Sequence, residues 1–328
     1  MLLSMPVRPG ARSAKRTASL IVWSLASVFG FYRLATFTPQ PLDAPHTLRP
    51  ILNAWFDIFL RSYAHPETAY ENWRTLCLLM LSVAPALAIL NLLWERASLR
   101  FPPRVAKVLC SRGLFFASIA AALLLCRYPT LLDYQLNPDE GEFLSAAHKL
   151  FYNPNFFAST DCGSSGPLNI YPLMLPAIFG LSPDYASSRM LVLLIALCAI
   201  YLFYRTVRLL ASDAIARIAI VPLACALAVF ENPNMVHYSS EQVPLLLIAL
   251  AFYIAVRVLH NPAAHRIPLF LLGMLTSAAF FSKMQSVPIV ASIGAVAIAF
   301  TCASCKTHFT RPVLLFVAGL APLQVLNA

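Results

Sequence analysis

The chain has 328 residues, of which 59% are hydrophobic and only 12% are charged, and its mean hydropathy is +0.70. A soluble globular protein carries about 25% charged residues, so this composition excludes that class and indicates a polytopic α-helical membrane protein. The formal net charge of +10 does not indicate nucleic-acid binding, because the basic residues flank apolar stretches, where they set membrane topology.

We expect an all-α fold with nine transmembrane helices, since a helix needs about 20 apolar residues to cross a bilayer. The nine apolar stretches cover residues 18–37, 74–94, 113–132, 188–208, 213–232, 242–259, 267–282, 285–304 and 312–328. The first is expected to be an uncleaved span, because no clear small-x-small cleavage site follows it. Between the first two spans, the segment near Ile51–Tyr63 is expected to form an interfacial helix.

The distribution of basic residues predicts the orientation. With these spans, 16 of the 24 Lys and Arg residues fall on one side of the membrane. They are Arg8, Arg12, Lys15, Arg16, Arg96, Arg100, Arg104, Lys107, Arg112, Arg205, Arg208, Arg217, Arg257, Arg266, Lys306 and Arg311. The positive-inside rule then places the amino terminus in the cytoplasm and the 133–187 loop outside.

The outer loop carries two adjacent carboxylates in the sequence Asn137-Pro138-Asp139-Glu140-Gly141, and six of the 14 acidic residues lie between positions 133 and 184. An amphipathic helix that lies in the headgroup plane is expected to follow, with an apolar face made by Phe143, Ala146, Ala147, Leu150 and Phe151. Two interpretations stay open. Asn137 and Glu140 fit the two positions of a helix capping box, whereas an ionised Asp139 suits a general base or a cation ligand.

Further polar residues stand at the outer ends of later spans. The apolar segment 170–181 is too short and too interrupted by proline to be a confident span, and is expected to be re-entrant or interfacial. Arg189 either anchors its helix at the headgroups or binds a lipid phosphate. Glu241 either stabilises a helix start or belongs to a site. Lys283 is the only charged residue between Arg266 and Lys306, and either anchors an outer turn or faces a polar cavity.

The order of these motifs resembles the polyprenyl-phosphate-dependent glycosyltransferases of the GT-C membrane fold, which include protein O-mannosyltransferases and the aminoarabinose transferases of bacterial lipid A. The matching elements are the Asn137–Gly141 sequence, Ser165-Gly166-Pro167-Leu168, Arg189, Ser240-Glu241-Gln242-Val243-Pro244, and Ser282-Lys283 together with Gly273. The resemblance covers roughly residues 96–328. Residues 1–95 would then be a transmembrane extension, and we expect a carboxyl-terminal portion to be missing, since family members run further.

The resemblance implies that a sugar moves from a polyprenyl-phosphate carrier to a glycan, lipid or protein acceptor at the extracytoplasmic face of a bacterial inner membrane, with inversion. Asp139 resembles the catalytic acidic residue that takes the acceptor proton. Glu140 would orient the acceptor or a divalent cation, and Glu241 matches the second acidic position. Arg189 and Lys283 resemble the residues that hold the donor phosphate.

Two other classes stay open: a non-catalytic or degenerate GT-C membrane protein, and a transporter or flippase of lipid-linked or anionic solutes. The transporter class is disfavoured because the acidic residues lie in outer loops and no internal repeat is visible. The pair Cys302 and Cys305 is not expected to bind a metal, since no second pair completes it. We expect no cofactor beyond the divalent cation considered near Asp139 and Glu140.

Overall fold

The computed structural model describes residues 66–96, 102–132, 137–229, 232–305 and 308–325. The expected span 18–37 and the expected interfacial helix near Ile51–Tyr63 lie outside these residues. In the part that the structure describes, 86% of residues are helical and no strand is present. The all-α expectation is therefore confirmed for this part of the chain.

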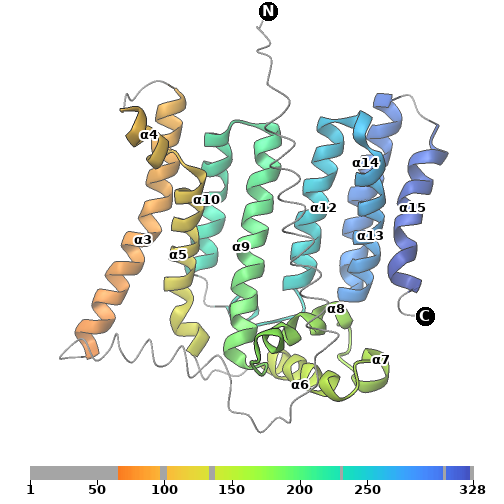
Figure 1. Cartoon of the computed structure of the whole chain (residues 1–328), viewed down its shortest axis with the longest axis horizontal. Helices are drawn as coiled ribbons and strands as arrows, with labels where there is room; N and C mark the ends of the chain where they lie inside the picture. Colours follow the sequence, from red (N-terminus) through yellow and green to blue (C-terminus); the bar gives the residue numbers. More distant parts are fainter. Residues whose placement is uncertain (1–65, 97–101, 133–136, 230–231, 306–307, 326–328) are drawn as a thin grey trace, which may run out of the picture.

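Eight long helices stand side by side and alternate in direction (Figure 1). They are α3 (Pro66–Glu95), α5 (Arg112–Leu132), α9 (Tyr185–Leu210), α10 (Asp213–Val229), α12 (Gln242–His260), α13 (Arg266–Ser282), α14 (Val287–Cys305) and α15 (Thr310–Val325). Except at the start of α3, which begins at Pro66 rather than at residue 74, their bounds match the expected apolar stretches to within a few residues, because the length of an apolar run is a local property of the sequence.

Five helical segments among the described residues are long and apolar enough to cross a membrane: Asn72–Glu95, Arg112–Leu132, Tyr185–Leu210, Gln242–His260 and Met284–Cys305. Arg266–Ser282 and Thr310–Pro322 are apolar but shorter. The membrane-protein class is supported by these helices. The expected total of nine spans is not confirmed, and the other four stay a prediction.

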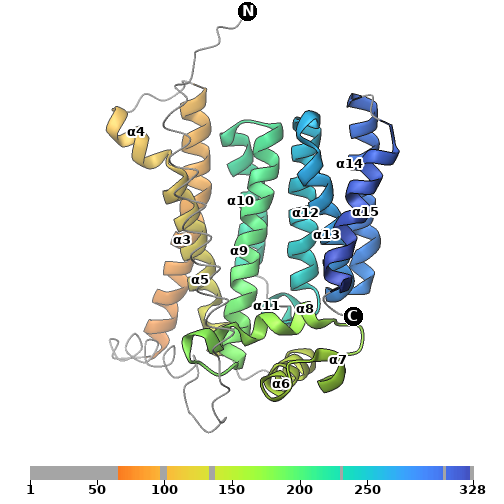
Figure 2. The ribbon, with the colours of Figure 1, turned by 45° about the vertical axis from the view of Figure 1, so that its right-hand side comes forward.

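The two ends of the helix layer differ in character. At one end, which we call the α6 end, four short elements cross the layer (Figures 1 and 2). They are α6 (Pro138–Tyr152), α7 (Phe156–Ser159), α8 (Pro167–Ile170) and the 3-10 helix η1 (Tyr171–Phe179). The opposite end, which we call the basic end, carries α4 (Pro103–Leu109) and a row of arginines at helix termini: Arg112, Arg205, Arg208, Arg217, Arg257, Arg266 and Arg311. This separation agrees with the charge asymmetry of the sequence.

Three hydrophobic clusters hold the layer together. One joins α3, α5, α9 and α10, and a second joins α12, α13 and α14 with support from α15. Where α13 meets α15, a Cβ on Gly273 would lie 2.0 Å from the backbone oxygen of Phe316. Only glycine permits this approach, which is the small-residue packing typical of helices in membranes.

The third cluster attaches α6 to the bundle. Phe143, Ala146, Ala147 and Leu150 are buried in it against η1 and α9, which confirms the predicted apolar face of α6 except at Phe151, which is half-buried. The helix starts as the sequence predicts, because the side chain of Asn137 accepts a hydrogen bond from the Asp139 backbone N–H at 3.1 Å, and Pro138 takes the first helical position.

Candidate functional site

Glu140 does not close the capping box. Its side chain turns into the bundle and is completely buried. One carboxylate oxygen, Oε1, accepts from the Ser188 hydroxyl at 2.5 Å and from the Tyr238 backbone N–H at 3.3 Å. The other, Oε2, accepts from Nε and Nη2 of Arg189 at 3.2 and 3.1 Å. Both oxygens of Glu140 are therefore occupied by protein donors.

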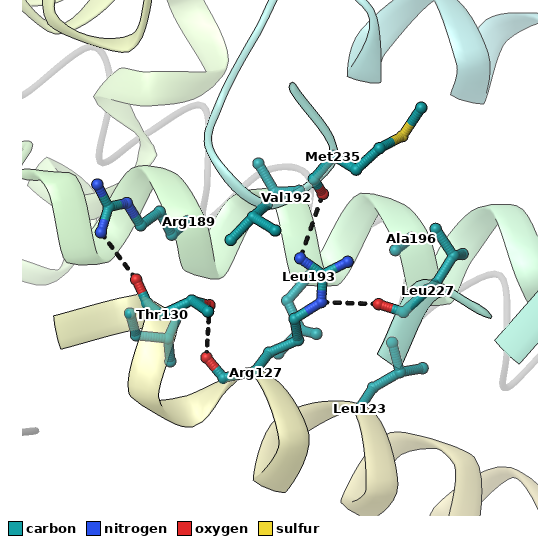
Figure 3. A pocket seen from close by; sticks show the side chains of 11 residues that line it. Leu123, Arg127, Thr130, Arg189, Val192, Leu193, Ala196, Leu227 and Met235 are labelled. Atoms are coloured by element: carbon teal, nitrogen blue, oxygen red, sulfur yellow. Dashed lines mark hydrogen bonds between the residues drawn. The ribbon is translucent and has the colours of Figure 1, made fainter. Parts of the chain in front are cut away.

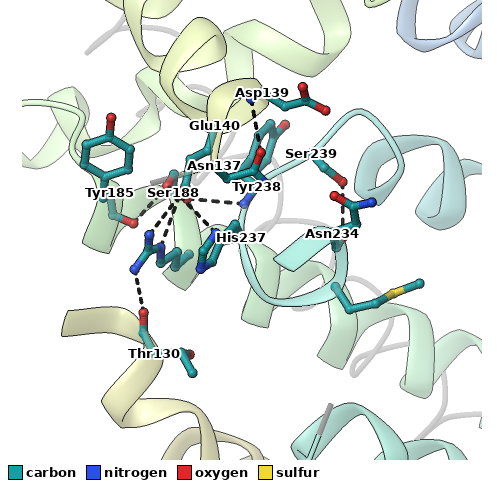
Figure 4. A network of polar contacts seen from close by, with 12 residues as sticks. Thr130, Asn137, Asp139, Glu140, Tyr185, Ser188, Asn234, His237, Tyr238 and Ser239 are labelled. Carbon is teal, nitrogen blue, oxygen red and sulfur yellow. Dashed lines mark hydrogen bonds and ion pairs between the residues drawn. The ribbon is translucent and has the colours of Figure 1, made fainter. Parts of the chain in front are cut away.

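Arg189 is the partner that neutralises this buried carboxylate. Its side chain is 1% exposed and lies in the first turns of α9, where it also donates from Nη1 to the carbonyl oxygen of Thr130 at 2.7 Å. The guanidinium carbon lies 5.7 Å from the centre of the Tyr185 ring. Figure 4 shows Ser188 of α9 and His237 and Tyr238 of the segment before α12 around Glu140 of α6. This set, Glu140, Ser188, Arg189, His237 and Tyr238, is called the buried cluster below.

Sequence reasoning missed the segment 237–240, which links the two halves of the site. His237 is 2% exposed, and its Nδ1 lies 3.9 Å from Oε2 of Glu140. Tyr238 is completely buried and donates its hydroxyl to the carbonyl oxygen of Asn169 at 2.7 Å. Burial raises the pKa of the Tyr238 phenol above its ordinary value, so it remains a neutral donor. The signal in the sequence was a polar run, His237 to Gln242, between two apolar stretches.

Glu241 and Lys283 form a second, accessible pair. Lys283 Nζ lies 2.5 Å from Oε1 of Glu241 and 2.6 Å from the Ser240 hydroxyl. The Glu241 side chain is 52% exposed and the Lys283 side chain 20%. Partial burial raises the pKa of the Glu241 carboxyl, but the hydrogen bonds from Lys283 and Ser239 outweigh burial, and the pKa lies below its ordinary value. The predicted residues at 241 and 283 therefore meet.

A backbone junction fixes Lys283 against the loop that precedes α8. Ser165 and Lys283 form an isolated antiparallel bridge, and the Gly166 N–H donates to the carbonyl oxygen of Ser282 at 2.8 Å. A Cβ on Gly166 would lie 2.2 Å from the backbone oxygen of Phe281, so this position requires glycine. Asn169 completes the junction, since its amide donates to the carbonyl oxygens of Ser240 and Ser282 at 3.3 and 3.1 Å. The motif at 165–168 thus has a structural task.

An open cavity of about 680 Å³ lies beside this junction. Its walls come from the loop Thr160–Pro167, from Phe156 and Phe157 of α7, and from the end of α13 with Met284 and Gln285. These last two residues directly follow Lys283 in the chain. The cavity is mixed in character, with aromatic side chains on one part of its wall and hydroxyl and amide groups on another. Such a mixture suits an amphipathic ligand.

Asp139 lies apart from the buried cluster. It is exposed at the start of α6, and Figure 4 shows its carboxylate directed away from Glu140. Neighbouring residues of a helix point about 100° apart, because an α-helix has 3.6 residues per turn. The adjacent acidic residues therefore serve different surroundings: Glu140 faces the bundle, and the carboxylate of Asp139 is accessible to a solute.

Arg127 is a second buried arginine that the sequence analysis overlooked. It lies in α5, is 7% exposed, and donates to the carbonyl oxygens of Leu227 and Met235 at 2.7 and 3.4 Å. Arg127 and Arg189 line one cavity of about 20 Å³ (Figure 3), which has room for about one water molecule. A charge within the apolar stretch 113–132 was the available signal, since such charges rarely occur without a partner.

The described residues contain no group of three or more His, Cys, Asp or Glu side chains placed to hold a metal ion. Because protein donors occupy both oxygens of Glu140, a divalent cation at this place would meet only the carboxylate of Asp139. All eight cysteines are free. In the loop between α7 and α8, burial raises the pKa of the Cys162 thiol above its ordinary value, which disfavours the reactive thiolate.

The five residues predicted from the sequence all lie at the α6 end, but they form three groups: the accessible Asp139, the buried ion pair of Glu140 with Arg189, and the accessible ion pair of Glu241 with Lys283. Comparisons of the chain with models of protein families, with curated proteins and with solved structures found no match.

Proposed function

We propose that this protein is a membrane glycosyltransferase that uses a polyprenyl-phosphate sugar as donor. The proposal rests on the α6 end, where the exposed carboxylate of Asp139 and the accessible lysine Lys283 lie on a bundle with helices long and apolar enough to cross a membrane. Lys283 also lies beside the cavity of about 680 Å³. A lipid-borne donor reaches such a site from the bilayer, and its phosphate needs a cation when the sugar leaves.

In the proposed reaction, an acceptor hydroxyl oxygen forms a bond to the anomeric carbon of the donor sugar. The bond between that carbon and the phosphate oxygen breaks, and the electron pair leaves on the polyprenyl phosphate. Attack from the opposite side inverts the anomeric carbon. Asp139 takes the hydroxyl proton, a task that requires an ionised and accessible carboxylate.

Lys283 receives the donor phosphate in this proposal. Its ammonium group is held at the site by Glu241 and Ser240. In the absence of donor, Glu241 balances the charge of Lys283. The donor phosphate would approach the exposed side of this pair and weaken the contact between the two residues. A flexible ammonium group suits this exchange, because it can reorient its three donors between a carboxylate and a phosphate.

Glu140 and Arg189 act as positioning residues rather than as groups that touch substrate. Their ion pair is out of reach of a solute, with exposures of 0% and 1%. It ties the first turn of α6 to the first turns of α9 and to the backbone of Tyr238. The pair therefore sets the position of Asp139, which precedes Glu140 in the chain.

A non-catalytic membrane protein is the second candidate, and one observation favours it. The two most buried of the predicted site residues neutralise each other completely, as in a structural ion pair. If Asp139 merely supports the start of α6, this end of the bundle has no chemical task. Donor turnover separates the two candidates.

The test uses the purified 328-residue chain in lipid nanodiscs with synthetic polyprenyl-phosphate donors that carry arabinose, aminoarabinose, mannose or glucose. The measurement is release of polyprenyl phosphate with water as the acceptor, whose oxygen bonds to the anomeric carbon and whose proton goes to Asp139, so the natural acceptor need not be known. We expect release with at least one donor. Absence of both release and donor binding across the set would contradict the proposal and favour the non-catalytic candidate.

A matched pair of lysine variants tests the phosphate contact. Lys283→Met should weaken donor binding by about 10- to 100-fold, since a hydrogen bond to a charged group contributes about 1.5–3 kcal/mol. Lys149→Met removes an exposed lysine from α6 at the same end and should leave donor binding unchanged. Equal donor binding by both variants would exclude Lys283 as the phosphate ligand.

A further inference from the structure

A groove of about 510 Å³ lies between α5 and α9 at the basic end, opposite the proposed transfer site. Arg112, Gly113 and Phe116 of α5 line it on one side, and Tyr201, Arg205 and Arg208 of α9 line it on the other. Arg112 and Gly113 are exposed, and Tyr201 is 43% exposed, so the groove opens at the surface of the bundle. The proposed glycosyltransferase reaction makes no use of it.

The charges around the groove are unbalanced. Arg112, Arg208 and Arg217 all pair with the single carboxylate of Asp213, at 2.8, 3.4 and 2.8 Å. Arg205 contacts no carboxylate among the described residues; it donates to the hydroxyls of Tyr201 and Tyr253 at 2.8 and 3.2 Å. Glu95 lies nearby and accepts from the Ala214 N–H at 3.1 Å. Four guanidinium groups therefore lie near two carboxylates, of which only Asp213 pairs with any of them, and this leaves a local positive excess.

Polarity changes along the length of the groove. Its arginines lie near the helix termini, whereas Phe116, Ala120 and Leu197 line the part nearer the middle of the bundle. From Arg208 to Leu197, α9 advances about 16 Å, roughly half the thickness of the hydrocarbon core of a bilayer. A phospholipid in one leaflet has the same arrangement, with a phosphate at the surface and an acyl chain below it.

We propose that this groove binds an anionic phospholipid, with the phosphate against Arg112, Arg205 and Arg208 and one acyl chain along Phe116, Ala120 and Leu197. The planar guanidinium groups bind phosphate oxygens through paired N–H donors. An anionic headgroup is favoured over a zwitterionic one because the surrounding protein carries excess positive charge. The bound lipid would stabilise the contact between α5 and α9.

The probe is a phosphatidylglycerol, titrated into the purified 328-residue chain in neutral detergent and detected by native mass spectrometry and by the melting temperature. A phosphatidylcholine with the same acyl chains measures headgroup preference, and inorganic phosphate measures the contribution of the anion without a chain. We expect phosphatidylglycerol to bind at least about tenfold more tightly than phosphatidylcholine, because phosphatidylcholine carries the same phosphate but adds a trimethylammonium group that the excess positive charge of the groove repels. Inorganic phosphate alone should leave the melting temperature unchanged. Equal binding of the two lipids, or full binding of phosphate alone, would overturn the proposal.

Two variants act on different parts of the groove. Arg205→Gln removes the guanidinium that has no carboxylate partner and should weaken phosphatidylglycerol binding by about tenfold. Gly113→Leu adds an apolar side chain to the lining of the groove and keeps every charge; a Cβ at this position meets nothing within 4 Å, so the first atom of the new side chain has room. It should also abolish the preference for phosphatidylglycerol.

Arg257→Gln is the matched control. Arg257 lies at the same end, over the Tyr253 ring at 5.9 Å, but does not line the groove. This variant should bind phosphatidylglycerol as the wild type does. A loss equal to that of Arg205→Gln would mean that diffuse surface charge, rather than the groove, attracts the lipid. A Gly113→Leu variant that melts early in the absence of lipid would instead place a protein segment in the groove and would also overturn the proposal.

Discussion

Removing the charge of Glu140 tests the buried cluster most sharply. Glu140→Gln keeps the size of the side chain, but it leaves the guanidinium of Arg189 buried without a counter-charge, and arginine remains protonated in proteins. It also places an amide donor among groups that donate to Glu140: the Ser188 hydroxyl, the Tyr238 N–H and Arg189 itself. Breaking a buried ion pair from one side costs about 3–5 kcal/mol.

Glu241→Gln provides the comparison. It breaks the other ion pair of the α6 end, whose carboxylate side chain is 52% exposed, so water replaces the lost partner. Exposed pairs contribute about 0–1 kcal/mol. The two Glu→Gln substitutions are chemically the same, and the difference of about 3 kcal/mol between them comes from burial alone.

The assay is thermal and denaturant unfolding of the purified protein in detergent, followed by size-exclusion chromatography with fluorescence detection. Glu140→Gln should lower the midpoint by on the order of 10 °C, and Glu241→Gln by much less. A double variant, Glu140→Leu with Arg189→Met, should recover part of the loss, because it leaves no unpaired charge. Equal midpoints for Glu140→Gln and Glu241→Gln would refute the assignment of a buried ion pair.

Three further predictions concern the junction, the accessible pair and the topology. Gly166→Ala should destabilise the protein by about 1–3 kcal/mol, as overpacking does, because its Cβ would meet the backbone oxygen of Phe281. Gly113→Ala should not destabilise the protein, since a Cβ there meets nothing within 4 Å. Equal melting temperatures of the two variants would contradict this prediction. The pKa of Glu241 is lowered, so the stability from its pair with Lys283 should be complete above the ordinary pKa of glutamate and should be lost as the pH falls through the pKa of the folded protein. Lys283→Met should remove this pH dependence of the melting temperature. A variant whose melting temperature depends on pH as the wild type's does would argue against the pair. A reporter fused after Gly163 should be extracytoplasmic and one fused after Ala211 cytoplasmic, and the reverse result would contradict the predicted orientation.

The sequence predicted the helices well because their signals are local. Apolar length predicted α5, α9 and α12 to within a few residues, and it predicted the end of α3 but not its start at Pro66. The spacing of Phe143, Ala146, Ala147 and Leu150 predicted the buried face of α6. The start of α6 was also predicted, since Asn137 and Pro138 act on the nearest backbone groups. The total number of spans was harder to predict, because α10, α13 and α15 are close to the minimum length of a helix that crosses a bilayer.

The pairing within the site was not predictable from these signals. Glu140 and Arg189 are separated by 49 positions, and nothing local indicates that they neutralise each other rather than bind substrate. The sequence predicts that Asp139 and Glu140 both serve one accessible site, whereas the structure exposes Asp139 and buries Glu140 completely. Tyr238 contacts Glu140 through its backbone N–H, a contact that depends on tertiary packing and leaves no signature in the side-chain sequence.

In the proposed reaction, the accessible carboxylate of Asp139 accepts a proton during sugar transfer. The most direct measurement compares polyprenyl-phosphate release by Asp139→Asn and by Glu142→Gln, which removes an exposed carboxylate from the same helix. Asp139→Asn should reduce turnover by roughly 100-fold or more, and Glu142→Gln should retain it. The free energy of unfolding of both variants should lie within about 1 kcal/mol of the wild-type value, because Asn137 still caps α6. Near-normal turnover in a well-folded Asp139→Asn variant would contradict the catalytic role of Asp139.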